Sequence, residues 1–240
     1  MSLSRPTARS CTRRIACAAG AAAAVCVGVL GATSAPALAW HGGGSYGGAY
    51  GYDYGYGLAG KPASATQNAE LAVCPGQTFS QPFEALQDSN YYTLVEGSEF
   101  NSASEGWELK NGAQIVEATR PDGSTGGVLD LPSGSYAISP PTCVTLQYPT
   151  ARTWVEDVEG ADGVMVGVSY AGVRTGPFGV PVGWLGARSS GGCELSSPFN
   201  VRPELAGSAE GVREVRFVFA NWGRGGDVHL SGLYVDPRMS

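Results

Sequence analysis

The chain has 240 residues, of which 36 are glycine and 15 are proline, and only 15% are charged. This composition argues against a coiled coil or a long-helix protein and favours strands joined by turns, and the length suits one sizeable domain. The 15 Lys and Arg residues are outnumbered by 21 Asp and Glu residues. We therefore expect no nucleic-acid partner, because nucleic-acid binders cluster positive charge.

Residues 1–39 have the layout of a cleaved export signal peptide. Four arginines lie in the first 14 residues, an apolar run spans residues 15–30, and the segment ends in Ala37-Leu38-Ala39, which predicts cleavage after Ala39. The pair Arg13-Arg14 leaves the general and the twin-arginine export routes both open. The apolar run is short for a membrane span and is not repeated, so we expect a secreted or wall-associated protein with no membrane partner.

Loss of this segment would make the protein strongly acidic. The segment holds four of the 15 basic residues and no acidic residue, which leaves 11 basic and 21 acidic residues in the mature chain. Such a charge disfavours binding to anionic polymers and membrane headgroups. The simpler interpretation is that it only keeps the protein soluble.

The segment 40–73 is expected to be a disordered tail and linker. Residues 40–60 consist mainly of Gly and Tyr and lack Val, Ile and Phe, so they cannot form a packed core. This part is either a flexible spacer or an adhesive tail whose tyrosine rings stack on sugars or on each other. Residues 61–73 are expected to continue as a linker.

Residues 74–238 are expected to form one all-β domain. Short apolar runs alternate with turn signals such as Pro121-Asp122-Gly123, a pattern typical of antiparallel sheets. Val215, Phe217 and Phe219 share one face, as a half-buried strand requires. The pattern predicts a jelly-roll-like antiparallel β-sandwich. The expected strands are 91–95, 113–117, 128–131, 136–139, 143–146, 153–158, 164–170, 212–220 and 228–235.

Three cysteines remain after the signal segment, namely Cys74, Cys143 and Cys193. Export would place them where disulfides form. Cys74 begins the expected domain and Cys143 lies in an expected strand, so we expect these two to pair. Cys193 would then be a free thiol or form an intermolecular bridge, although the sequence leaves open that it pairs with either of the other two.

A series of short motifs runs through residues 74–237. They are Cys74-Pro75-Gly76-Gln77, Phe79, Pro82-Phe83, Asn90-Tyr91, Thr93-Leu94-Val95, Trp107, Ser139 to Val144 and Leu233 to Pro237. Together these motifs resemble a family of uncharacterised exported proteins of high-GC Gram-positive bacteria. The resemblance implies a bridge between Cys74 and Cys143, and it implies no known activity.

A second resemblance concerns residues 95–101, Val-Glu-Gly-Ser-Glu-Phe-Asn, which are followed by Gly106-Trp107. This segment is similar to the galactose-binding-like sandwiches that include many carbohydrate-binding modules. Those modules often hold a structural calcium with an early Glu and a late Asp-Asp pair, whereas Asn101 and Ser231-Gly232 stand in these places here. Calcium prefers several carboxylate oxygens, so the resemblance implies the fold and leaves the calcium site without its ligands. We expect no metal and no cofactor.

The sequence contains no strong catalytic constellation, and we do not expect an enzyme. After residue 39 the histidines are His41, in the tail, and His229, in an expected strand, which disfavours a triad with a histidine base. His229 alternates with Val228 and Leu230 and is interpreted as a solvent-facing strand residue. A group of carboxylates is interpreted as a solvated strand end, consisting of Glu156, Asp157, Glu159 and Asp162.

Aromatic side chains are the best functional lead. Sugar rings stack their apolar faces on Trp and Tyr, and their hydroxyls bond to nearby polar groups. Trp107 is expected in the core. We therefore expect a non-catalytic exported sandwich that binds an extracellular polysaccharide or cell-wall polymer through loop aromatics, with Trp184, Trp222, Arg224 and Trp154 as the binding residues. Trp184 and Trp222 are each flanked by glycine, a setting typical of exposed loops. The alternative is a structural or adhesive surface protein that acts through the Gly/Tyr tail and self-association, with contacts made by Cys193.

Overall fold

The computed structural model describes residues 60–101, 106–158, 160–186, 192–206 and 211–238. The predicted export signal, the tail up to residue 59 and Glu159 lie outside these ranges. Within the described residues, no helix has both the length and the apolar character that crossing a membrane requires.

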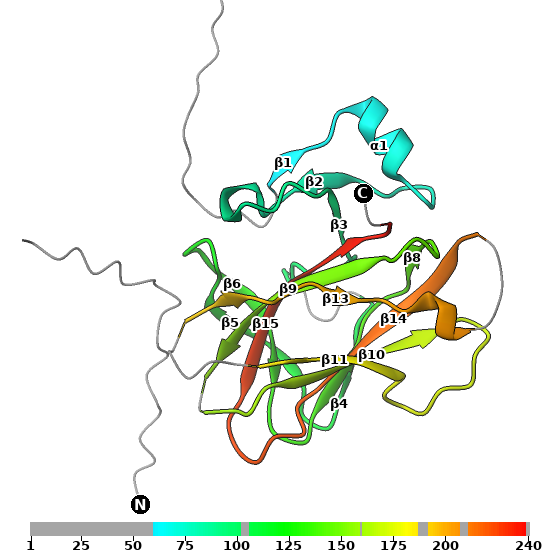
Figure 1. Cartoon of the computed structure of the whole chain (residues 1–240). Coiled ribbons are helices and arrows are strands. Elements are labelled where there is room, and N and C mark those ends of the chain that lie inside the picture. The colour runs from blue at the N-terminus through cyan, green and yellow to red at the C-terminus, as the bar shows by residue number, and fades with distance from the viewer. Residues whose placement is uncertain (1–59, 102–105, 159, 187–191, 207–210, 239–240) are drawn as a thin grey trace, which may run out of the picture. The chain divides into compact units, whose positions relative to one another are not determined.

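The described chain consists mainly of antiparallel strands, with one short α-helix and two turns of 3-10 helix (Figure 1). In chain order the elements are β1 (Lys61–Pro62), α1 (Ala65–Leu71), β2 (Phe79–Gln81), η1 (Glu84–Leu86), β3 (Tyr92–Leu94), β4 (Glu108–Lys110), β5 (Gln114–Thr119), β6 (Thr125–Leu131), β7 (Tyr136–Ile138), β8 (Thr142–Val144), β9 (Thr150–Asp157), β10 (Val164–Tyr170), β11 (Val180–Leu185), β12 (Glu194–Leu195), β13 (Phe199–Asn200), η2 (Pro203–Ala206), β14 (Arg213–Ala220) and β15 (Val228–Asp236).

The strands form two sheets, called sheet A and sheet B, which pack face to face. Within the described residues, sheet A has nine strands: β1, β2, β3, β5, β6, β9, β12, β13 and β15. Sheet B has six described strands, β4, β7, β8, β10, β11 and β14. Neighbouring strands run antiparallel in both sheets. The predicted antiparallel β-sandwich is confirmed.

Strand β15 organises sheet A because it has partners on both edges. Residues 228–230 pair with β6, residues 234–235 pair with β3, and β9 lies along the other edge. The register shifts between Ser231 and Leu233, and Gly232 in this bulge has a φ of 64°. A Cβ at Gly232 would lie 2.7 Å from the Tyr234 ring, so the bulge requires glycine.

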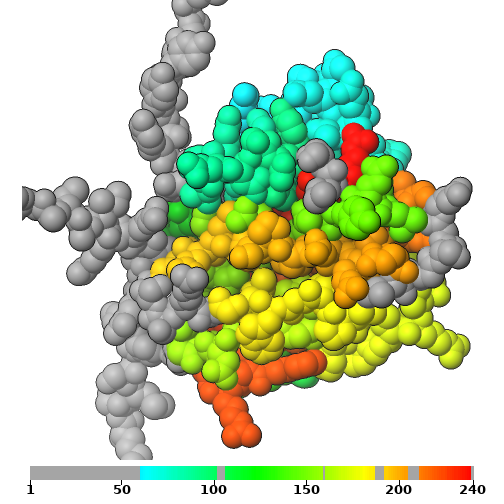
Figure 2. Space-filling view, in the orientation of Figure 1, coloured from blue at the N-terminus to red at the C-terminus, as the bar shows by residue number. Residues whose placement is uncertain are grey.

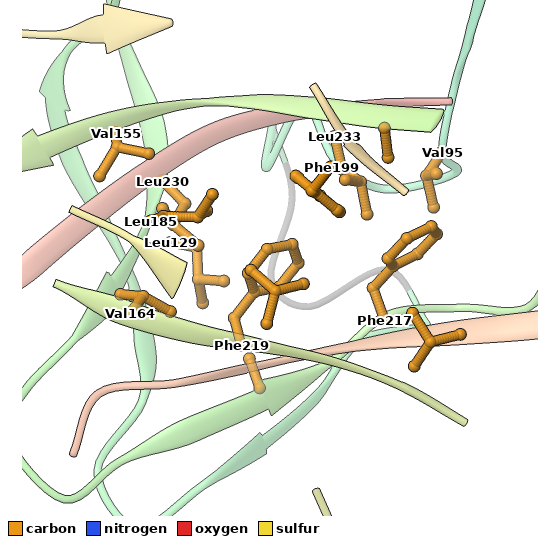
Figure 3. Close-up of a cluster of buried hydrophobic side chains, with 14 of the residues drawn as sticks. Val95, Leu129, Val155, Val164, Leu185, Phe199, Phe217, Phe219, Leu230 and Leu233 are labelled. Atoms are coloured by element: carbon orange, nitrogen blue, oxygen red, sulfur yellow. The ribbon is translucent and has the colours of Figure 1, made fainter. Parts of the chain in front are cut away.

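The hydrophobic core lies between the two sheets, where inward side chains from both layers meet (Figure 3). On β14, Val215, Phe217 and Phe219 are all buried in this cluster, so the predicted apolar face is confirmed. Sheet A contributes residues from β6, β9 and β15 on the opposite side. The labelled members in Figure 3 are Val95, Leu129, Val155, Val164, Leu185, Phe199, Phe217, Phe219, Leu230 and Leu233.

The segment 61–73, which was expected to be a linker, carries β1 and α1 instead. Strand β1 pairs with β2, and α1 begins with a capping box in which Ser64 and Gln67 satisfy each other's backbone amides. Asn68 fixes the helix against β2, because its Oδ1 accepts a hydrogen bond of 2.7 Å from the Phe79 amide. In Figure 2 this segment is the cyan part of the surface, next to the teal residues that follow it in the chain.

A disulfide between Cys74 and Cys143 confirms the predicted pairing and ties the N-terminal segment to β8 of sheet B. The Gln77 side chain strengthens this junction, since its Nε2 donates to the Cys143 carbonyl at 3.1 Å. Cys193, which precedes β12, has an interaction partner in the structure. We therefore do not treat Cys193 as a free thiol, and an intermolecular bridge stays a prediction.

Replacing both Cys74 and Cys143 by serine should lower the free energy of unfolding by about 4 kcal/mol, because the bridge closes a long loop in the unfolded chain. The two cysteines are 69 residues apart in sequence. Urea unfolding of the oxidised protein and the double variant measures the difference. An unchanged unfolding midpoint would contradict a stabilising role for the bridge.

Candidate functional site

The outer face of sheet B, which points away from the core, carries a continuous row of side chains across five strands. Trp184 on β11 pairs with Met165 on β10, which pairs with Ala220 on β14. Ala220 pairs with Tyr136 on β7, and Tyr136 pairs with Lys110 on β4. Paired residues of antiparallel strands project to the same side of the sheet. The row is therefore apolar over four strands and ends in an ammonium group.

The middle of this face is buried although it points away from the core. Met165 is 4% exposed, and Val218 and Ala220 are fully buried. The loop between β10 and β11 accounts for this burial, because it places Phe178 over the face. The Phe178 ring lies edge-to-face against Tyr136 at 5.1 Å and against Trp222 at 4.9 Å between ring centroids.

Gly167 allows this loop to approach the sheet. It sits on β10 opposite Val218, and a Cβ at this position would overlap the Phe178 carbonyl oxygen. A strand glycine of this kind marks a place where another part of the backbone comes close. The aromatic layer of Phe178, Tyr136 and Trp222 therefore depends on glycine at position 167.

Two tryptophans at the same end of this face remain half exposed. Trp184 is 49% and Trp222 is 50% exposed. The Trp184 indole is oriented by its Nε1, which donates to the Asp162 carbonyl at 3.3 Å. The backbone at Gly223, next to Trp222, packs against Asp162 as well. Both tryptophans thus border the turn that contains Asp162, whose side chain is exposed.

The loop from β14 to β15, which carries Trp222 and Arg224, is fixed by the buried side chain of Asn221. Its Nδ2 donates to the Leu131 carbonyl at 2.8 Å and to the Gly226 carbonyl at 3.1 Å, and its Oδ1 accepts from the Gly223 amide at 3.0 Å. In Figure 1 this loop, drawn orange-red, projects from the lower edge of the domain. Trp222 and the exposed Arg224 are therefore presented by an ordered loop.

The opposite end of the face carries three linked charges. Glu108 accepts from Arg216 at 3.1 Å, and its second oxygen lies 3.5 Å from the Lys110 ammonium. All three side chains are between 40% and 47% exposed. Exposed pairs of this kind add little to stability, so these groups are free to exchange partners with a ligand.

The structure brings three of the four predicted ligand-binding residues to this face and its border: Trp184, Trp222 and Arg224. Trp222 lies in a loop as predicted, whereas the loop placement of Trp184 is wrong, because it pairs with Met165 within strand β11. Trp154 lies elsewhere. It projects from the outer face of sheet A and packs against Phe83, with 6.2 Å between ring centroids, in a cluster that includes Tyr92 and Tyr234. The N-terminal segment covers it, so Trp154 is a packing residue. Trp107 is buried in the core as expected.

Sequence reasoning missed Tyr136 and Phe178. Tyr136 was assigned to a strand but not to a binding surface, because its neighbours on other strands were not known. Phe178 stands in Gly176-Pro177-Phe178-Gly179, a turn-like setting that signals a loop and gives no indication of where the loop folds.

A second polar cluster lies on the outer face of sheet A and was also missed. His229 on β15 is placed between two carboxylates, with its Nδ1 3.4 Å from Glu156 and its Nε2 3.7 Å from Asp130. The three side chains are only 7% to 15% exposed. The interpretation of His229 as a solvent-facing residue is therefore wrong, because neighbouring strands enclose it.

Two of the four carboxylates expected at a solvated strand end are enclosed as well. Glu156 and Asp157 are buried, and Asp157 accepts hydrogen bonds from the Gly160 and Ala161 amides at 2.5 and 2.9 Å. Asp162 is exposed as expected. Among the described residues, no group of three or more His, Cys, Asp or Glu side chains is arranged to hold a metal ion.

Burial raises the pKa of the Asp130 carboxyl above its ordinary value. The hydrogen bond from Gln114 Nε2, at 2.9 Å, and the charge of His229 act in the opposite direction and offset part of this effect. One oxygen of Asp130 has no hydrogen-bond partner. The ionised form of Asp130 is thus disfavoured in the folded protein.

A shallow hollow of about 380 Å³ lies apart from both clusters, beside β5 and β6. Arg120 holds its rim by donating to the Glu99 carbonyl at 2.6 Å and to Asn101 Oδ1 at 2.7 Å. The hollow is lined by Phe100, Asn101, Ile115, Val116, Glu117, Gly126 and Gly127. Its aromatic ring, Phe100, is buried in the core, so the hollow offers no exposed ring for stacking.

No family model and no curated protein matches this sequence, so the resemblance to an exported Gram-positive family stays a prediction. Solved structures are similar in part. The K1 cleaved adhesin domain of Lys-gingipain from Porphyromonas gingivalis shares 12% identity with a TM-score of 0.39, over 57% of this chain and 94% of that chain. The module TmCBM61, solved in complex with β-1,4-galactotriose, shares 11% identity with a TM-score of 0.35, over 59% of this chain and 95% of that chain.

An arabinoxylan arabinofuranohydrolase of glycoside hydrolase family 43 from Bacillus subtilis is similar at 18% identity with a TM-score of 0.38, over 55% of this chain. The similarity spans 26% of the length of that enzyme. These likenesses are remote.

Replacing Asp130 by asparagine should increase the free energy of unfolding at about pH 7, because the variant removes a carboxylate that is disfavoured when ionised in the folded state. Because the pKa of Asp130 is raised in the folded state, the destabilisation of wild type by the ionised carboxylate is fully present above that pKa. The stability that the variant gains over wild type should decrease as the pH falls through the raised pKa and vanish below the ordinary value of 3.8.

Urea unfolding of wild type and Asp130→Asn over this pH range measures the effect. Glu214→Gln, which removes an exposed carboxylate on β14, is the control for the loss of one negative charge. A variant that is less stable than wild type at about pH 7 would show that the ion pair with His229 outweighs the burial penalty.

Proposed function

We propose that this chain is an exported, non-catalytic β-sandwich protein that binds a glycan or another cell-surface polymer through the outer face of sheet B. The observation that carries the proposal is the pair of half-exposed tryptophans, Trp184 and Trp222, at one end of an ordered aromatic layer. A protein that exposes two indole rings at the border of one turn, next to polar groups, has the features of a recognition surface.

Stacking on these rings suits a sugar because both partners have flat apolar faces. The rings are already ordered, since Trp184 bonds to the Asp162 carbonyl and Trp222 packs on Phe178. Little side-chain entropy is then lost on binding, which favours affinity. The exposed carboxylate of Asp162 accepts hydrogen bonds from hydroxyls, and Arg224 donates them.

The proposal contains no catalytic step. The polar groups that the proposal uses on the face of sheet B are the three linked charges of Glu108, Lys110 and Arg216 and the exposed Asp162. This arrangement suits hydrogen bonding with hydroxyls. The export that the first 39 residues predict would give such a surface access to extracellular polymers.

Trp184→Ala and Trp222→Ala should each weaken binding to the recognised polysaccharide about tenfold or more. Each substitution removes the exposed half of an indole ring, which a bound sugar would cover. The measurement is binding of residues 40–240 to a panel of soluble polysaccharides and bacterial cell walls. Thermal unfolding of each variant establishes that the fold is retained.

Tyr148→Ala is the matched control, since Tyr148 is 76% exposed but lies in the loop after β8. It should bind like wild type. Binding that survives both tryptophan substitutions but disappears when residues 40–59 are deleted would contradict the proposal and favour a structural or adhesive role for the Gly/Tyr tail.

A further inference from the structure

The turn at residues 160–163 contacts the elements that carry both half-exposed tryptophans. On β11, the Trp184 indole donates its hydrogen bond to the Asp162 carbonyl at 3.3 Å. In the loop that carries Trp222, a Cβ at Gly223 would lie 3.4 Å from the Cβ of Asp162. The side chain of Asp162 therefore leaves the backbone at the point where the two tryptophan-bearing elements meet.

The Asp162 carboxylate is held in place but is not neutralised. The turn is fixed by Asp157, which accepts hydrogen bonds from the Gly160 and Ala161 amides. The Asp162 side chain is exposed, and no described residue forms a hydrogen bond or an ion pair with its carboxylate. A carboxylate next to exposed indole rings attracts a cation twice, through its own charge and through the negative faces of the rings.

The charges around this site have the same sign as Asp162. The turn and the loop pack together, since the Val158 amide donates to the Asp227 carbonyl at 3.0 Å. In sequence, residues 157–163 and 221–227 hold four acidic residues and one basic residue, Arg224. Arg224 forms no ion pair with a described carboxylate. The surroundings therefore favour a positively charged ligand over an anionic one.

We infer that this site binds a glycan with free, protonated amino groups, with one ammonium group paired to Asp162 and the sugar rings stacked on Trp184 and Trp222. This inference rests on the proposed function and specifies the class of sugar.

A free amino sugar satisfies both parts of the site. It keeps the apolar ring face that stacks on an indole. Its ammonium group donates charge-assisted hydrogen bonds to the Asp162 carboxylate, and these are stronger than the bonds that a neutral hydroxyl donates. N-acetylation removes the positive charge and leaves the ring face unchanged. The site should therefore distinguish a free amino sugar from its acetylated form.

The test uses β-1,4-linked hexasaccharides of glucosamine, N-acetylglucosamine and glucose, which share length and linkage and differ in the group on C2. Titration calorimetry measures their binding to the mature protein, residues 40–240, at mildly acidic pH and low salt. The glucosamine hexasaccharide should bind at least about tenfold more tightly than the other two, a difference of ~1.4 kcal/mol. The preference should decrease as salt is added, because exposed charges are screened.

Asp162→Asn should weaken binding of the glucosamine hexasaccharide about tenfold and change binding of the other two by less than about twofold. Glu84→Gln is the matched control, since it removes an exposed carboxylate from η1, between β2 and β3 of sheet A. It should change none of the affinities. Trp184→Ala should weaken binding of all three, because stacking does not depend on the group on C2. Thermal unfolding of each variant establishes that the fold is retained.

The outcomes separate the inference from the proposed function. Equal affinity for the three hexasaccharides, or an Asp162→Asn variant that keeps the preference for glucosamine, would overturn the inference and leave the proposed function standing. Binding only to a polysaccharide without amino groups would do the same. Binding of a hexalysine peptide, with no binding of any glycan, would overturn both and make the site one for a cationic polypeptide.

Discussion

The close approach of the loop between β10 and β11 to sheet B determines which side chains are exposed on the outer face of that sheet. The outer face of sheet B carries Met165 and Val218, apolar side chains that must be shielded from water. Gly167 lets the loop come close enough for Phe178 to cover them, and the edge of Phe178 then supports Trp222. The shielding of an apolar strand surface and the ordering of an exposed indole are consequences of the same contact.

The outer faces of the two sheets are covered in different ways. Sheet A is covered by the N-terminal segment, where Phe83 packs on Trp154 and Tyr234, and Arg152 pairs with Asp88 across the cluster at 2.5 Å. The disulfide to Cys143 keeps that segment in place. On sheet B, the described residues provide a layer of aromatic rings whose outer members, Trp184 and Trp222, stay half exposed. The apolar strand surface is covered, and the two half-exposed tryptophans remain accessible to a partner. The proposed binding role is therefore assigned to sheet B.

Much of the fold could be predicted from sequence, because alternation and turn signals are local. The expected strand 164–170 coincides with β10, and each of the nine expected ranges overlaps an observed strand. The elements missed include α1, which is only seven residues long, and strands such as β12 and β13, which at two residues each are too short to show alternation. Strand β11 was missed although it has six residues, because Pro181 and Gly183 interrupt its apolar pattern. The site was harder to predict. Trp154 and Trp184 look alike in sequence, and only the packing of Phe83 distinguishes the covered ring from the exposed one. The enclosure of His229 depends likewise on pairing with β6 and β9, strands far away in the chain.

The central claim is that ligand meets the protein at Trp184 and Trp222. The most direct measurement is a nuclear magnetic resonance titration that follows the indole N–H signals of Trp107, Trp154, Trp184 and Trp222 while oligosaccharides derived from the panel of soluble polysaccharides are added. The account predicts saturable shifts confined to Trp184 and Trp222, with the signals of the buried Trp107 and the partly buried Trp154 unchanged. Shifts at Trp154, or saturable binding that leaves both Trp184 and Trp222 unmoved, would contradict it.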